Sequence, residues 1–107
     1  MGAVNILAQV APAATTETTL YQSEVRAKAL CQEIVVCNRS GSPSSFRVSV
    51  SLNGALTAAK DYLYYNTPIN GNDTLAVELG LTINAFDIVR VYASSGDLTF
   101  TMFGNPT

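Results

Sequence analysis

The chain has 107 residues, of which 48% are apolar and only 13% are charged, and its formal net charge is −2. This length fits one domain. The six Lys and Arg residues are scattered, which excludes the clustered basic surface that nucleic-acid binding requires. No apolar stretch approaches the roughly 18 residues of a membrane span. A charged fraction below the usual value of about 25% is typical of a surface that docks or self-associates, or of a plain Thr-rich β-surface.

Residues 1–14 are Ala-rich and show no period, which predicts an N-terminal arm ahead of a domain over residues 15–107. We expect the arm either to be disordered or to pack on a neighbouring subunit. In the second case its apolar anchors would be Val4, Ile6, Leu7 and Val10. The segment lacks the basic region of a signal peptide, so we expect the chain to function without crossing a membrane by a cleaved signal.

The first half of the domain predicts three strands. Residues 15–21 are Thr-rich and suit a first strand, and residues 29–38 are apolar on both faces, as a central strand is. A polar turn over residues 39–44 leads to a third strand over residues 45–52. In that strand Val48, Val50 and Leu52 share one face, and the opposite face carries Arg47, Ser49 and Ser51.

The second half continues with the strong turn signal Asn53-Gly54, and residues 55–61 fit either a helical turn or a strand. Residues 62–65 predict a strand and residues 67–73 a loop. Residues 74–83 alternate most clearly, with a possible bulge or bend at Gly80. Two more strands follow over residues 86–93 and from Leu98 onward. Seven or eight short strands indicate an antiparallel β-sandwich, jelly-roll-like or Ig-like.

Four tyrosines could form an aromatic surface. In a regular strand Tyr62 and Tyr64 share one face and Tyr65 lies on the other, and Tyr92 comes from a later strand. These tyrosines could belong to the core and the ordinary surface of the sheet, to a subunit interface, or to a carbohydrate site.

Residue chemistry indicates no catalytic centre. The sequence contains no histidine, the commonest general base and metal ligand, and no glycine-rich phosphate loop. Cys31 and Cys37 would lie about 20 Å apart on one extended strand, too far for a disulfide, so we expect buried free thiols. We therefore expect neither enzymatic activity, nor a metal, nor a cofactor.

Three segments together resemble a group of small structural proteins of tailed bacteriophages. They are "TTETTLYQ", "EIVVCNRSGSPSSFRVSVSLNG" and "DYLYYNTPINGNDTLAVELGLTINAFDIVRVYASSGDLTFTMFGNP". The motifs that match in order and spacing cover residues 16–21, 36–48, 62–65, 80–93 and 100–104. The resemblance extends over about residues 15–104. The stretch "SEVRAKALCQE" departs from the pattern, in which a Pro/Gly turn precedes an apolar strand, and this puts the start of the second strand in doubt.

The resemblance implies a β-sandwich that serves in the virion without catalysis. We expect a capsid decoration (cement) protein, which binds the major capsid protein, forms a homo-oligomer, most simply a trimer, and is assembled in the cytoplasm of the host bacterium. Its contact residues would be the four arm residues together with Tyr62, Tyr64 and Tyr65. The alternatives are a collar, tail or baseplate accessory protein and, in another class, a carbohydrate-binding or receptor-binding module. We expect no partnership with nucleic acid or membrane.

Overall fold

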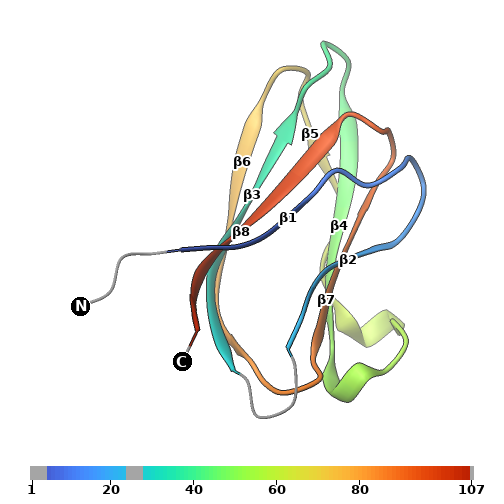
Figure 1. Cartoon of the computed structure of the whole chain (residues 1–107). Coiled ribbons are helices and arrows are strands. Elements are labelled where there is room, and N and C mark those ends of the chain that lie inside the picture. The colour runs from blue at the N-terminus through green and yellow to red at the C-terminus, as the bar shows by residue number, and fades with distance from the viewer. Residues whose placement is uncertain (1–4, 24–27, 107) are drawn as a thin grey trace.

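Eight strands form two four-stranded antiparallel sheets that pack face to face, so the prediction of an all-β sandwich is confirmed (Figure 1). The computed structural model describes residues 5–23 and 28–106. The strands are β1 (Asn5–Val10), β2 (Thr18–Gln22), β3 (Ala29–Asn38), β4 (Ser44–Ser51), β5 (Tyr62–Ile69), β6 (Thr74–Ile83), β7 (Ile88–Ala93) and β8 (Leu98–Pro106). Two short 3₁₀ turns, η1 (Leu52–Gly54) and η2 (Ala59–Asp61), lie between β4 and β5.

The strand order identifies the sandwich as a jelly roll. The first sheet runs β1-β8-β3-β6 and the second β2-β7-β4-β5. The chain therefore pairs β1 with β8, β2 with β7, β3 with β6 and β4 with β5, like one long hairpin rolled into two layers. Eight strands wound in this way form the double-sheet jelly roll, whereas an Ig-type sandwich has a different strand order.

The core lies between the two sheets and is built from the inward-facing residues of alternating strands. Phe46 of the second sheet and Phe100 of the first meet there edge to face, with ring centroids 6.1 Å apart. The other large apolar side chains that are almost fully buried are Ile34, Val36, Val48, Ile69, Ile83, Val89, Val91, Leu98 and Met102. Burying aromatic and aliphatic side chains from both sheets holds the layers together.

The clearest sequence prediction holds along β6. Leu75, Val77, Leu79, Leu81 and Ile83 face the core, whereas the residues between them are exposed. Gly80 has a φ of +58°, and the β3–β6 register shifts beside it, which confirms the predicted bulge. β3 covers the predicted residues 29–38, so the doubt about its start is resolved in favour of that prediction.

Within the arm predicted over residues 1–14, the structure corrects the prediction for residues 5–10. Residues 5–10 form β1, an edge strand of the first sheet that pairs with β8. Val10 lies opposite Phe100 and Ala8 opposite Met102, and both pack against the core. The pairing register shifts between Ile6 and Ala8, and this bulge removes the strict alternation by which a strand is detected from sequence.

A smaller difference concerns β5, which continues to Ile69 through the residues predicted to form a loop. Pro68 cannot donate a ladder hydrogen bond and is tolerated because β5 lies at the edge of its sheet. Residues 55–61, for which a helical turn and a strand were both open, contain η2.

Candidate functional site

Each sheet buries one face against the other sheet and presents its second face to solvent (Figure 1). Candidate functional side chains gather on both of these outer faces. On the second sheet they form a group of aromatic rings and one arginine. On the first sheet they form a hollow with two carboxylates.

The tyrosine–arginine cluster consists of Arg47 on β4, Tyr62 and Tyr65 on β5, and Tyr92 on β7. The guanidinium carbon of Arg47 lies 4.4 Å from the ring centroid of Tyr65 and 4.1 Å from that of Tyr92. The Nε of Arg47 donates a hydrogen bond to Oδ1 of Asn66 at 2.7 Å. A planar guanidinium held between two rings is stabilised by cation–π attraction and is fixed in orientation.

Alternation in β4 positions the arginine. Phe46 and Val48 are buried in the core, so Arg47 between them points outward, as the sequence predicted. The same prediction fails for Leu52, which lies beyond the strand in η1 and is 63% exposed.

Bulges in β5 place the tyrosines differently from the prediction. Val48 and Ser49 are consecutive, yet they pair with Tyr64 and Tyr62, so Leu63 is an extra residue in β5. Tyr62 is thereby turned to the outer face, where its ring meets that of Tyr65 edge to face at 4.8 Å. Tyr64 is half-buried and stacks on Phe46, with ring centroids 6.3 Å apart. The expectation that Tyr62 and Tyr64 share a face is therefore wrong.

Arg90 anchors the loop beside the cluster, a role that the sequence did not indicate. Its Nη1 donates to the hydroxyl oxygens of Ser51 at 3.0 Å and Thr57 at 2.9 Å, and to the carbonyl oxygen of Ala55 at 3.0 Å. These contacts hold the β4–β5 connection against β7. A long donor-rich side chain fits this task because its guanidinium carries five N–H groups.

Asp61 fixes the other end of that connection. Its carboxylate accepts hydrogen bonds from the Ala58 backbone N–H at 2.8 Å and from the Lys60 ammonium at 3.0 Å. These two donors, the Ala58 N–H first, lower the pKa of Asp61 below its ordinary value. The interactions favour the ionised carboxylate and so stabilise the folded loop at neutral pH.

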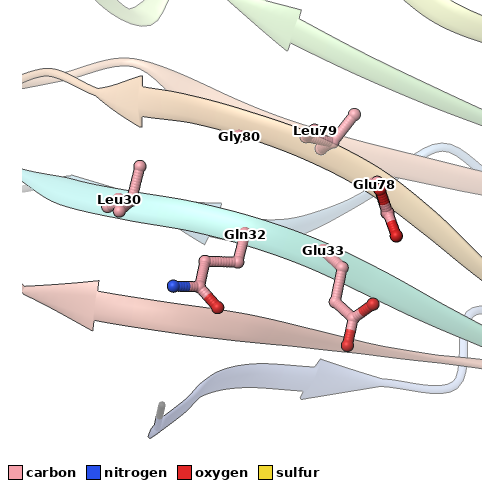
Figure 2. Close-up of a pocket in the computed structure, with 6 residues that line it drawn as sticks. All are labelled: Leu30, Gln32, Glu33, Glu78, Leu79 and Gly80. Carbon is pink, nitrogen blue, oxygen red and sulfur yellow. The ribbon is translucent and has the colours of Figure 1, made fainter. Parts of the chain in front are cut away.

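On the first sheet, Glu33 of β3 lies directly opposite Glu78 of β6 in the antiparallel ladder. Figure 2 shows both carboxyl groups pointing to the same side of the two strands, while Leu79 points to the other side. The residues line an open hollow of about 600 Å³. Like charges directly opposite each other destabilise a sheet, so this pair carries a cost in the isolated chain.

Strand bulges create the hollow. From Cys31 to Glu33, β3 advances by two residues. Over the same step the paired residue in β6 moves by three, from Leu81 to Glu78, and the paired residue in β8 moves by one, from Gly104 to Phe103. The extra residues are Gln32 in β3 and Leu79 with Gly80 in β6, and all three line the hollow (Figure 2). Bulges bend a strand and redirect its side chains, which explains why the outer face is concave here.

The four predicted N-terminal contact residues lie in different environments. Val4 lies outside the described residues. Leu7 and Val10 pack against the core of their own chain. Ile6, paired with Phe103, is 57% exposed and remains available for contact.

The two cysteines are free, as predicted. Cys31 is buried, and burial raises the pKa of its thiol to about 11, so the thiol stays protonated at neutral pH. Cys37, on the same strand, is half-buried. In residues 5–23 and 28–106 no group of three or more His, Cys, Asp or Glu could hold a metal ion, and within the same ranges no helix is long and apolar enough to cross a membrane.

Comparison of this chain with protein-family models, with curated proteins and with solved structures finds no match.

Proposed function

We propose that this chain is a non-enzymatic structural protein of a tailed-phage particle, bound to the capsid as a decoration protein. Many copies would bridge neighbouring subunits of the major capsid protein and reinforce the shell against internal pressure. The chain would also associate with copies of itself, most simply as a trimer. Its chemistry is adhesion, carried by exposed side chains on rigid strands.

The tyrosine–arginine cluster carries this proposal. Tyr and Arg are enriched in protein–protein interfaces and among the residues that dominate binding energy. Tyr65 is 56% exposed although it is a large aromatic residue, and Arg47 holds its ring from one side. A cluster fixed on three strands loses little conformational entropy on binding, which favours affinity.

The fold supports the proposal by analogy. Jelly rolls occur in viral capsid proteins, and also in lectins and cupins, so the fold is compatible with a virion role without being specific for it. The phage assignment itself rests on the sequence motifs over residues 15–104.

Ile6 extends the candidate contact surface to the first sheet. Its side chain is 57% exposed beside Phe103, and apolar side chains of this size are typical of contact surfaces when they lie near one another. Tyr62 and Tyr65 would bind through the second sheet. The two outer faces give the chain two directions in which to contact neighbours.

The test is the copy number of the chain per purified particle, measured by quantitative mass spectrometry against the major capsid protein. We expect hundreds of copies, the number that decoration of a shell requires. A count of about three to eighteen would contradict decoration and favour the alternative position at the collar, tail or baseplate. Absence from the particle would overturn both positions.

The exposed tyrosines are the observation that favours a carbohydrate-binding role. The position of Arg47 in the cluster weighs against that role. Sugars stack on free aromatic faces, whereas Arg47 occupies one face of both Tyr65 and Tyr92. A glycan array with the wild-type chain and a Tyr65→Ala variant separates the two functions. Glycan binding that disappears in this variant would support the carbohydrate role.

A further inference from the structure

The two outer faces carry opposite charges. Arg47 and Arg90 lie on the outer face of the second sheet, on β4 and β7. Glu33 and Glu78 lie on the outer face of the first sheet, on β3 and β6. Within the part of the chain that the structure describes, the single ion pair is Lys60–Asp61, so none of these four charges is neutralised by a partner of opposite sign.

Arg47 is prepared to bind a carboxylate. Its guanidinium is held between Tyr65 and Tyr92, and only its Nε has a hydrogen-bond partner among the described residues. Its two terminal nitrogens have no hydrogen-bond acceptor within residues 5–23 and 28–106. A guanidinium fixed in this way recognises carboxylates through paired, charge-assisted hydrogen bonds.

Glu33 and Glu78 are suited to accept such a group. They lie opposite each other in the ladder and line the hollow, and neither carboxylate has a hydrogen bond or ion pair in the described parts of the chain (Figure 2). A cation placed between them would remove the repulsion that the isolated chain bears.

The geometry points to a contact in which the tyrosine–arginine cluster of one copy packs over the Glu33–Glu78 hollow of the next, so that the terminal nitrogens of Arg47 meet the two carboxylates. The occupant of the hollow is thus a second copy of this chain. The charge complementarity of the two outer faces supplies the attraction, and the tyrosines around Arg47 supply apolar contact area. The inference rests on the proposed function in one respect, namely that the chain self-associates.

The contact is heterologous, because different surfaces of the two copies meet. β1 and β2 are edge strands that contact each other, so β6 and β5 form the edges on the other side of the sandwich. The hollow and the cluster therefore both lie toward this second side, rather than at diametrically opposite points. Repetition of such a contact closes into a ring or extends as a chain, depending on the rotation between copies.

The test uses two variants that each remove one half of the contact, Arg47→Ala and the double variant Glu33→Gln/Glu78→Gln. Analytical ultracentrifugation of the full chain should show self-association of the wild type. Each variant alone should associate roughly tenfold more weakly or not at all. An equimolar mixture should form a one-to-one complex that does not grow, because each copy retains one complementary half.

Two controls separate this contact from general surface effects. Arg39→Ala removes an exposed positive charge, as Arg47→Ala does, and Glu17→Gln removes an exposed negative charge, but both residues lie outside the two faces. Both control variants should associate like the wild type. Raising the salt concentration from about 0.05 M to about 0.5 M should weaken wild-type association, because the contact is between opposite charges. Circular dichroism confirms that every variant is folded.

Three results would overturn the inference. The first is wild-type association that both variants retain, which would leave self-association in place but through another surface. The second is stronger association of the Glu33→Gln/Glu78→Gln variant, which would identify the carboxylates as charges that keep the β6 edge apart from other strands. The third is a wild type that stays monomeric at all concentrations. The particle copy number is measured separately, so failure of the contact and failure of the virion role are distinguishable.

Discussion

Arg47 and Tyr92 are direct cross-strand partners on β4 and β7, and the Arg47 guanidinium carbon lies 4.1 Å from the centre of the Tyr92 ring. Cross-strand pairs of this kind are the unit of sheet stabilisation. The pair joins two central strands of the second sheet and also fixes the orientation of the arginine on the outer face. It therefore links the stability of the fold to the proposed adhesive surface.

We expect Tyr92→Leu to lower the free energy of unfolding by about 0.5–1 kcal/mol, because it removes one cation–π contact at a partly exposed site. The measurement is urea denaturation followed by circular dichroism. Arg47→Lys is the matched variant, since it keeps the charge but loses the planar group that stacks. Equal stability of Tyr92→Leu and wild type would contradict a contribution from the pair.

The edge strand β1 should contribute to stability through one face only. Val10→Ala removes a side chain that packs against the core opposite Phe100, and we expect a loss of about 1 kcal/mol. Ile6→Ala removes a 57% exposed side chain and should change stability by less than about 0.5 kcal/mol. Thermal unfolding of both variants checks this, and equal effects would contradict the pairing of β1 with its own sandwich.

Asp61 predicts a pH-dependent contribution. Its pKa is lower in the folded chain than in the unfolded one, so its stabilisation is complete above the unfolded value of about 3.9 and disappears as the pH falls through the folded value. We expect Asp61→Asn to be less stable than wild type at pH 7 and the difference to shrink toward acid pH. Denaturation curves at a series of pH values test this, with the exposed Glu17→Gln as control. A constant difference at all pH values would show that the charge of Asp61 is irrelevant.

Gly104 is required where β8 approaches β3. A Cβ at this position would overlap the carbonyl oxygen of Leu30 and would lie 3.0 Å from Cδ1 of Leu7. We expect Gly104→Ala to destabilise the fold by about 1–3 kcal/mol, because neither backbone nor packed side chain can move away freely. Gly96→Ala, where the nearest atom is 3.9 Å from the added carbon, should stay within about 0.5 kcal/mol of wild type. Similar unfolding midpoints for the two variants would contradict the close approach.

Regular alternation is what made much of the fold predictable. The five apolar residues of β6 and the buried Phe46 and Val48 of β4 follow the period of two, and burial of apolar area selects the face. β1 escaped detection because the bulge near Leu7 interrupts its pattern. Pro68 indicated a loop because the position of β5 at the sheet edge is a property of the tertiary fold.

The candidate site was harder to predict than the fold because it depends on register. The sequence indicates Tyr62 and Tyr65 as contact residues, but the bulge at Leu63 decides that their rings meet and that Tyr64 turns to the core. The pairing of Glu33 with Glu78, 45 positions apart in the numbering, follows from the strand order, which local sequence does not specify. Arg90 binds groups that a loop brings to it, so its role requires the folded chain.

The proposed reinforcement of the head is tested most directly by the heat stability of purified particles with and without this chain. Release of packaged DNA is followed with a dye while the particles are heated. We expect particles lacking the chain to release DNA at a lower temperature, and we expect the purified chain, when added back, to restore the original value. Identical release temperatures for the two kinds of particle would contradict a decoration function.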